Sequence, residues 1–169
     1  IEQPEVPGGE DNPGSGSGDE PGEGGDDPEE AADLAAETLL SMGIYRLDGV
    51  ILTHFDSDHA GGVAYLLTRV SADYLFLPDC PDEDETSQAL YAYTEGAVQT
   101  VLKDMVVSFG NTKISIIPSK SASSNNESGL AILFQTENCD ILITGDRSEK
   151  GELELIEHMT LPELEVLIV

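Results

Sequence analysis

The stretch Thr53-His54-Phe55-Asp56-Ser57-Asp58-His59-Ala60-Gly61-Gly62 directly follows the apolar run Val50-Ile51-Leu52. A short, mostly β-branched apolar run predicts a buried strand, so these polar side chains lie where a strand ends and a loop begins. Gly61 and Gly62 are expected to let the chain turn tightly into the next element. Alternate residues of an extended chain point to one side, and the loop residues that follow can turn toward the same point. The sequence therefore predicts a metal site formed by His54, Asp56, Asp58 and His59.

Turn chemistry is the simpler interpretation of the same residues. Asp and Ser are common in loops, and an aspartate in front of a helix often serves only as its N-cap. Capping needs a single acid, whereas here two acids and two imidazoles follow one hydrophobic strand. We therefore favour the metal site and keep the turn-and-cap interpretation as its alternative.

A further aspartate follows a second apolar run. Residues 140–144 predict a strand that ends in Gly145-Asp146. An aspartate at the end of a buried strand is a typical metal ligand, although Thr-Gly-Asp by itself is also a common turn. Beside the first cluster we interpret Asp146 as a fifth ligand. His158 falls on a predicted acidic helix, where a surface position is expected for it.

These motifs resemble a known family. The pattern His-x-Asp-x-Asp-His-x-Gly-Gly resembles the metallo-β-lactamase signature His-x-His-x-Asp-His, with Asp56 at the position of the second histidine. With residues 43–48 and 142–146, it looks like the nuclease-like domain of the ComEC family of DNA-uptake proteins. The resemblance implies an α/β metallo-β-lactamase-like fold, a four-layer αββα sandwich, incomplete in this chain.

The resemblance covers about residues 34–169. The family's Asp-x-Gly-x-Gly-Asp segment would precede the first helix, and its Gly-His-His-Gly-Ser segment would follow Val169. A central portion without these segments is expected to have exposed sheet edges and an incomplete metal shell. Inactivity of this fragment is therefore an open alternative.

The resemblance also implies roles for individual residues. His54 and Asp56 would hold one ion, and Asp58 and His59 a neighbouring one, with Asp146 between them. Asp58 would also be the catalytic residue that orients the attacking water. Replacing a histidine by an aspartate makes the ligand set richer in oxygen, which favours Mn²⁺, with Zn²⁺ as the alternative, for one or two ions.

Asn125 is the remaining candidate. The segment Asn125-Asn126-Glu127-Ser128 matches an Asn-x-x-Ser pattern of the resembling family. This match implies a weak metal ligand or a substrate contact at Asn125. The alternative is a residue that only shapes the loop.

The expected chemistry is hydrolysis, because a bound divalent ion lowers the pKa of water and so makes a nucleophile. The resemblance implies a phosphodiesterase that cleaves single-stranded DNA during uptake. It places the domain on the extracytoplasmic side of a bacterial membrane, within a longer membrane protein. Two alternatives stay open: hydrolysis of a small ester, lactone or phosphoester, and a metal-poor scaffold without catalysis.

Charge argues against the DNA substrate. The 169 residues, enough for one domain, carry a net charge of −27, from 34 acidic and 7 basic side chains. Because phosphate binding depends on Lys and Arg, such a surface is a poor match for nucleic acid. Residues 1–30 hold no Lys or Arg and predict a disordered acidic linker rich in Gly and Pro, which leaves 31–169 as the domain portion.

The remaining pattern alternates helices and strands, which indicates a layered α/β arrangement. We predict helices at 29–42, 62–68, 86–103 and 149–158, and strands at 49–53, 74–77, 106–107, 113–117, 130–134, 140–144 and 164–169. No apolar run approaches the roughly 18 residues of a membrane helix, so the chain itself is expected to be soluble. Cys80 and Cys139 lie in no Cys-x-x-Cys pattern, so a disulfide is permitted but not required.

Overall fold

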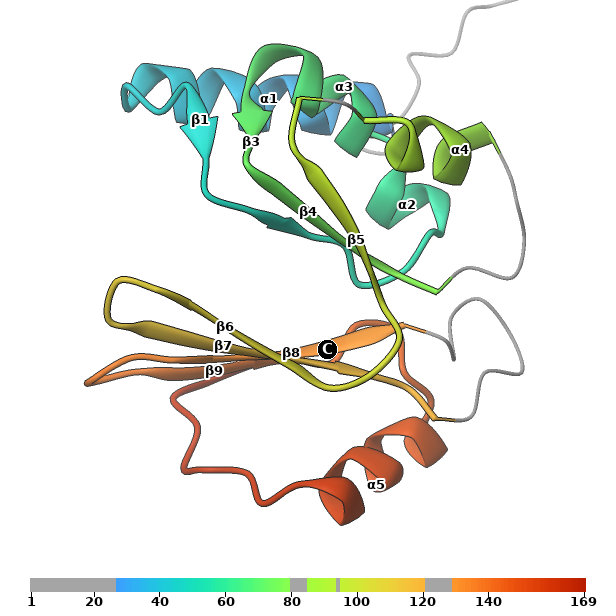
Figure 1. The fold of residues 1–169 in the computed structure, drawn as a ribbon, viewed down its shortest axis with the longest axis vertical. Coiled ribbons are helices and arrows are strands. Elements are labelled where there is room, and N and C mark those ends of the chain that lie inside the picture. Colours follow the sequence, from blue (N-terminus) through green and yellow to red (C-terminus); the bar gives the residue numbers. More distant parts are fainter. Residues whose placement is uncertain (1–26, 80–84, 94, 121–128) are drawn as a thin grey trace, which may run out of the picture.

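The computed structural model describes residues 27–79, 85–93, 95–120 and 129–169, which fold into four stacked layers. Figure 1 shows helices on one outer side, then a three-stranded sheet, a five-stranded sheet, and a helix on the other outer side. This is the layer order of an αββα sandwich, so the predicted α/β fold is confirmed.

The helices are α1 (Pro28–Ser41), α2 (Ser57–Ala60), α3 (Val63–Arg69), α4 (Glu85–Tyr91) and α5 (Glu149–His158). The strands are β1 (Arg46–Leu47), β2 (Val50–Ile51), β3 (Ser71–Ala72), β4 (Tyr74–Pro78), β5 (Ala97–Val101), β6 (Met105–Phe109), β7 (Thr112–Pro118), β8 (Leu130–Gln135), β9 (Asp140–Ile143) and β10 (Val166–Ile168). No described helix has the length and apolar character needed to cross a membrane.

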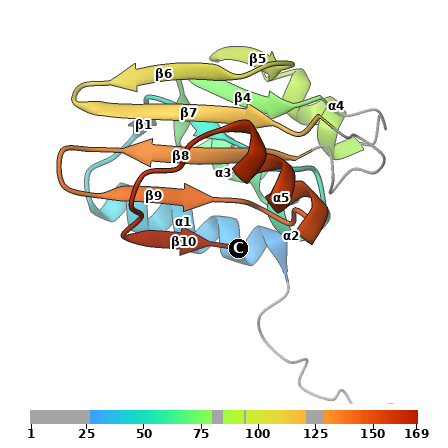
Figure 2. The same cartoon turned by 90° about the horizontal axis from the view of Figure 1, so that it is seen from below.

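The two main sheets differ in strand direction. The smaller sheet has the order β2-β4-β5 and is parallel throughout. The larger has the order β10-β9-β8-β7-β6, in which β6 to β9 run antiparallel and β10 runs parallel to β9. Figure 2 shows these five strands side by side, with α5 packed across their outer face. The short strands β1 and β3 form a separate parallel pair.

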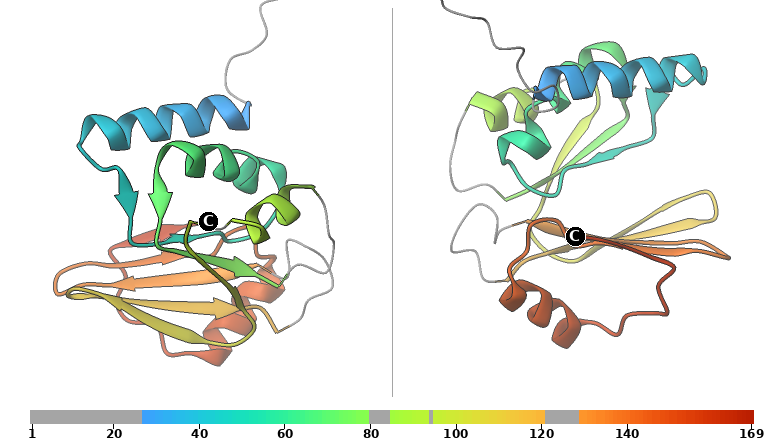
Figure 3. Two further views of the ribbon diagram at one scale, coloured as in Figure 1. Left: turned by 45° about the horizontal axis from the view of Figure 1, so that its top comes forward. Right: turned by 180° about the vertical axis from the view of Figure 1, so that it is seen from behind.

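Figure 3 shows the four layers from two further sides. Three clusters of apolar side chains hold these layers together. Alternation along β4 sends Leu75 and Leu77 toward the helices and Phe76 toward the larger sheet. On the far side, Leu133 of β8 packs with Leu155 of α5. Burying one such side chain contributes about 1.5–3 kcal/mol, so a shift of β4 by one residue would be strongly disfavoured.

Helix α1 begins and ends as its sequence signals predict. The Asp27 carboxylate accepts a hydrogen bond from the Glu29 N–H at 3.0 Å, and Pro28 stands in the first turn. At the other end the Gly43 N–H donates to the Leu40 carbonyl at 3.0 Å. Residues 28–30 thus form a helical turn, while residues 1–26 of the predicted linker lie outside the described residues.

Gly61 and Gly62 form the predicted turn between α2 and α3, but close packing, and not a special backbone angle, is the reason for glycine there. Both have ordinary negative φ angles, −56° and −89°. A Cβ atom on Gly62 would lie 2.3 Å from the Pro28 carbonyl oxygen and 2.8 Å from the Ala32 Cβ. The glycine pair therefore lets α1 pack directly against the turn that follows the metal-type loop.

The predicted helix at 86–103 is confirmed only as far as Tyr91 and is wrong beyond it. Helix α4 ends at Tyr91, and residues 97–101 form β5, which pairs with β4. The run Ala97-Val98-Gln99-Thr100-Val101 alternates with period two and is rich in β-branched residues, which favours a strand. A Cβ atom on Gly96 would lie 2.2 Å from the Ala72 carbonyl oxygen, so this glycine marks a close chain approach.

The other predicted elements are confirmed, and their ends differ from the predicted ends by small shifts. The first strand is shorter than predicted, because β2 covers only Val50–Ile51. The short elements β1, β3 and α2 were not predicted. Cys139 is half-buried and is not in a disulfide among the described residues, and Cys80 lies outside them.

Candidate metal centre

The first part of the site is the loop that leaves β2. Leu52 and Thr53 continue as an extended segment, with the Leu52 N–H bonded to the Phe76 carbonyl at 3.0 Å. The Thr53 carbonyl accepts a hydrogen bond from the Leu130 N–H at 2.7 Å, which ties this segment to the larger sheet. The next residue, His54, is therefore held at the junction of the two sheets.

Helix α2 turns the following residues back toward His54. Asp56 stands at its N-cap, and its carbonyl accepts hydrogen bonds from the His59 N–H at 3.0 Å and the Ala60 N–H at 2.8 Å. The Asp56 carboxylate makes no capping hydrogen bond. The turn-and-cap interpretation therefore does not account for this side chain, whose oxygens are left for another partner.

The second part of the site is the turn after β9. Gly145 has a φ of +61°, and a Cβ atom at this position would lie 3.2 Å from the Thr53 Cβ. Both the backbone conformation and the space favour glycine. The turn brings Asp146 beside the loop after β2, and α2 and the start of α5 lie at the same end of the sandwich (Figure 1).

One ligand atom from each of His54, His59 and Asp146 lies within 4.8 Å of the others. One carboxylate oxygen of Asp146 lies 3.7 Å from the His54 Nε2, and the other lies 3.4 Å from the His59 Nε2. Two donors bound at about 2.1 Å to one tetrahedral ion lie about 3.4 Å apart. The three side chains thus have the spacing of ligands around one cation.

His54 is the most constrained member of this group. Its side chain is 1% exposed, and its Nε2 has no hydrogen-bond partner among the described residues. Its Nδ1 lies 3.1 Å from the Thr53 Oγ1. When Nδ1 carries the proton and donates to Thr53, Nε2 presents a lone pair toward Asp146, which is the tautomer that a metal-binding histidine needs.

Electrostatics favour the neutral form of His54. Burial lowers its pKa below the ordinary value, and the neighbouring His59 acts in the same direction. The carboxylates of Asp146, Asp56 and Asp58 oppose this shift without reversing it. The His54 and His59 ring centroids are only 4.0 Å apart, so two imidazolium charges would repel strongly.

The other predicted ligands lie at the edge of this group. An oxygen of Asp56 is 3.9 Å from the His54 Nε2, and an oxygen of Asp58 is 3.6 Å from the His59 Nε2. The Asp58 side chain is 74% exposed. Asn125 lies outside the described residues.

His158 lies on the surface, as predicted, and belongs to a different set of contacts. It is exposed at the end of α5, where its Nε2 lies 2.6 Å from a carboxylate oxygen of Asp104. Its Nδ1 lies 2.5 Å from the Lys120 Nζ.

Sequence analysis missed two residues that border the centre. Thr53 contacts both His54 and Gly145, and Arg147 is a buried cation directly after Asp146. Thr53 could have been found from its position between the strand and the first histidine. Arg147 carried no comparable signal, because an arginine after a turn is usually exposed.

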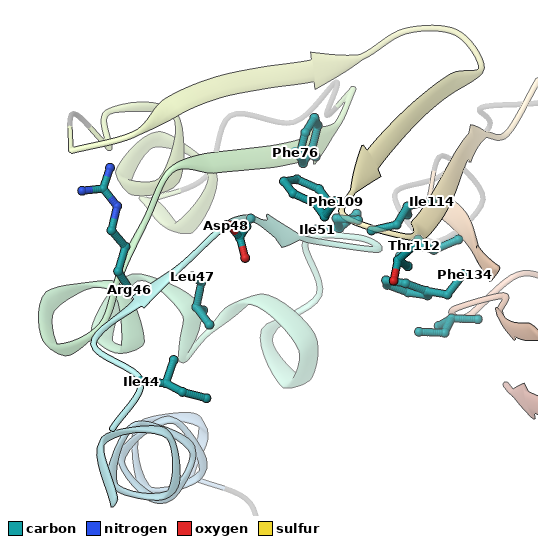
Figure 4. A pocket seen from close by; sticks show the side chains of 13 residues that line it. Ile44, Arg46, Leu47, Asp48, Ile51, Phe76, Phe109, Thr112, Ile114 and Phe134 are labelled. Atoms are coloured by element: carbon teal, nitrogen blue, oxygen red, sulfur yellow. The ribbon is translucent and has the colours of Figure 1, made fainter. Parts of the chain in front are cut away.

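A separate cavity of about 570 Å³ opens between the sheets and contains none of the candidate ligands. Figure 4 shows apolar side chains from several strands around it, among them Ile51, Phe76, Phe109 and Ile114. The acidic residue in its wall is Asp48, and Arg46 in the same wall is ion-paired with Asp73. The cavity is thus an apolar space distinct from the histidine and aspartate group.

Comparison with known proteins agrees with this fold. The pattern described as the metallo-β-lactamase superfamily matches residues 20–75, which include the first four candidate ligands. Among solved structures, CmlA, a diiron β-hydroxylase from Streptomyces venezuelae, has a TM-score of 0.52 and 16% sequence identity. That match covers 73% of this chain and 25% of CmlA and concerns the fold. The chain contains part of a metallo-β-lactamase superfamily domain.

A relative in Bacillus subtilis (strain 168) indicates the branch of the superfamily to which the chain is similar. ComE operon protein 3 is 30% identical over 125 residues, which are 70% of this chain and 16% of that protein. The chain is therefore a partial, ComEC-like domain of the superfamily. It spans less than a fifth of the length of this relative.

Proposed function

We propose that this domain is a metal-dependent hydrolase in which His54, His59 and Asp146 hold a divalent cation. The observation that supports this proposal most strongly is the buried His54 Nε2, which has no hydrogen-bond partner among the described residues. Leaving such an atom unpaired costs about 1–3 kcal/mol. A cation bound between this atom and the Asp146 carboxylate would remove that cost.

The two flanking aspartates complete the proposed centre. Asp56 would add an oxygen ligand on the His54 side, and Asp58 would do so on the His59 side. A divalent cation bound here would supply Lewis-acid activation of water. Because the Asp58 carboxylate is exposed yet lies 3.6 Å from the His59 Nε2, it can orient an entering water and accept its proton. The oxygen-rich set favours Mn²⁺, with Zn²⁺ as the alternative.

Single-stranded DNA is the substrate that we propose. This choice rests on the likeness of residues 43–62 and 142–146 to the ComEC nuclease-like family and on the similarity to ComE operon protein 3. The same likeness supports a position on the extracytoplasmic side of a bacterial membrane, within a longer protein. A phosphodiester suits a cationic centre, because the cation can neutralise charge on the phosphate oxygens.

One observation favours a second candidate, a small ester, lactone or phosphoester. The chain has only 7 basic side chains against 34 acidic ones. A long polyanion gains most of its affinity from such basic groups. A small substrate bound mainly through the cation would not need them.

Metal binding is the first test. Adding Mn²⁺ or Zn²⁺ to the metal-free protein should raise its melting temperature, with Asp146→Ala as the variant that loses the effect and His158→Gln as the control that keeps it. If neither ion changes the melting temperature, the proposal of a hydrolase is contradicted, and the metal-poor scaffold without catalysis becomes the favoured function.

Cleavage is the second test. Labelled single-stranded DNA and p-nitrophenyl esters and phosphodiesters are incubated with the protein and Mn²⁺. Product from DNA that disappears in Asp58→Ala supports the nuclease. Metal binding with turnover of small substrates alone would favour the second candidate, and cleavage that survives Asp58→Ala would point to a contaminant.

A further inference from the structure

Arg147, the residue after Asp146, is buried although it is a cation, with 8% of its surface exposed. Its Nη2 donates to the Ile117 carbonyl at 2.6 Å and to the Gly129 carbonyl at 3.1 Å. Ile117 belongs to the end of β7, and Gly129 directly precedes β8. The guanidinium therefore joins the two strand ends on either side of the connection from β7 to β8.

The same strand end continues to the histidine side of the metal centre. Leu130, next to Gly129, donates its N–H to the Thr53 carbonyl at 2.7 Å. Thr53 in turn contacts the His54 Nδ1 through its hydroxyl, at 3.1 Å. A short series of hydrogen bonds thus runs from Arg147 through Gly129 and Leu130 to Thr53 and ends at His54.

Packing in α5 is arranged around this side chain. Gly151 lies inside α5, where glycine is among the least favourable residues for a helix. A Cβ atom at Gly151 would lie 3.3 Å from the Arg147 Cβ, closer than most such contacts. Helix α5 therefore has a glycine, a poor helix former, at the position that contacts the Arg147 side chain.

A buried arginine is a costly way to fill this space. Burial lowers the pKa of the Arg147 guanidinium, and the charge of Glu154 offsets only part of that effect. Its acceptors are carbonyl groups, and its Nε has no hydrogen-bond partner among the described residues. An apolar side chain of similar size would fill the same volume without burying a charge. What it could not supply is an N–H group such as the Nη2 amino group, which donates to both carbonyls at once.

We infer that Arg147 is a positioning residue of the metal centre, whose guanidinium fixes the spacing between Asp146 and His54 by clamping the β7 and β8 ends. This inference rests on the proposed function, because the spacing matters only when a cation is bound. Among the described residues, its side chain makes no hydrogen bond to a candidate ligand, so its effect on the cation is transmitted through Gly129, Leu130 and Thr53. Partners of metal ligands typically change metal affinity about 10–100-fold when they are removed.

The experiment compares Arg147→Met, Arg147→Lys and the wild-type chain for affinity toward Mn²⁺ and Zn²⁺ and for the absorption spectrum of bound Co²⁺. We expect Arg147→Met to weaken binding at least about tenfold and to alter the Co²⁺ spectrum. Arg147→Lys, which keeps a charge and a donor, should restore part of the affinity. Arg69→Met is the control, because Arg69 pairs with Asp33 between α3 and α1 and should change stability alone.

Gly151→Ala separates positioning from a merely structural role and keeps the test valid if Arg147→Met fails to fold. Alanine favours the helix, but its Cβ would lie 3.3 Å from the Arg147 Cβ and displace that side chain, so metal affinity should fall severalfold while the chain stays folded. Unchanged affinity and an unchanged Co²⁺ spectrum in a folded Arg147→Met, or in Gly151→Ala if Arg147→Met does not fold, would overturn the inference. A wild-type chain that binds none of these ions would instead refute the proposed function.

Discussion

The Nε2 atom of His54 lies 3.7 Å from a carboxylate oxygen of Asp146, and the two residues extend from different sheets. His54 follows β2 of the smaller sheet, and Asp146 follows β9 of the larger one. A cation bound by both would therefore connect the two halves of the sandwich. Occupancy of the centre should accordingly stabilise the whole fold and not only the loops that carry the ligands.

Replacing His54 by Gln should remove most of this stabilisation. An ion at about 100 times its dissociation constant stabilises a folded protein by about 2.7 kcal/mol. His54→Gln should abolish that gain in urea unfolding with and without Mn²⁺, whereas the surface variant His158→Gln should retain it. Equal gains in both variants would show that the ion binds elsewhere.

The stability of the metal-free protein should depend on pH through His54. Because burial lowers its pKa in the folded state, the folded protein binds fewer protons than the unfolded chain, and acid favours unfolding. This loss of stability is absent at pH values well above 6.5, the ordinary pKa of histidine. It grows as the pH falls below 6.5, by up to about 1.4 kcal/mol per pH unit. Urea unfolding at about pH 7.5 and about pH 5.5 would measure it.

The control for this pH experiment is His54→Gln, which removes the titrating group. Carboxylates elsewhere in this acidic chain also respond to pH, but they do so in both proteins. The difference between wild type and variant therefore isolates His54. Parallel losses of stability in the two proteins would rule out the expected effect.

Gly145→Ala should weaken both the fold and the metal centre. An alanine at a φ of +61° is strained, and its Cβ would contact the Thr53 side chain at 3.2 Å. We expect a loss of about 1–3 kcal/mol in stability together with weaker metal binding, because Thr53 and Asp146 would be pushed apart. Calorimetry with and without metal would measure both effects.

Gly110→Ala is a matched control for this change. Gly110 has a similar φ of +58°, but nothing lies within 4 Å of an added Cβ, and the turn between β6 and β7 is remote from the ligands. This variant should lose stability through backbone strain alone and keep its metal affinity. A similar loss of affinity in both variants would mean that global destabilisation explains it.

The candidate ligands could be predicted from sequence because their positions follow from local rules. The candidates lie in the segment that follows β2 or in the turn after β9, both apolar strands, and strand ends are common places for metal ligands. The pattern did not indicate which donors meet. His54, His59 and Asp146 converge, while Asp56 and Asp58 lie beside one histidine each. That distinction depends on the crossing of the two sheets, which a linear pattern does not contain.

The segment 86–103 shows where periodicity fails. Its apolar residues fit a helix and a strand about equally well, and the deciding contact is between Gly96 and Ala72, which are distant in the chain. Arg147 was missed for the same reason, because its partners Ile117 and Gly129 come from other strands. In both cases the deciding contacts join residues that are distant in the chain.

Gly96→Ala tests the role of this close approach. The added Cβ would lie 2.2 Å from the Ala72 carbonyl oxygen and 2.9 Å from the Asp73 carbonyl oxygen, so β5 would have to move away from β4. Overpacking of this kind typically costs about 1–3 kcal/mol. Urea unfolding should show such a loss, although alanine is the better helix former. Increased stability would restore the helical assignment of this segment.

Asp56→His should change which metal the centre prefers. The Asp56 carboxylate lies 3.9 Å from the His54 Nε2 and is about one-third exposed, so an imidazole can replace it without displacing the core. Exchanging an oxygen donor for a nitrogen donor favours Zn²⁺ over Mn²⁺. Competition titrations should show the ratio of Zn²⁺ to Mn²⁺ affinity rising at least about tenfold, while Asp48→His, which adds a histidine away from the ligands, leaves it unchanged. A ratio unaffected by Asp56→His would mean that residue 56 does not bind the cation and that His54, His59 and Asp146 act without it.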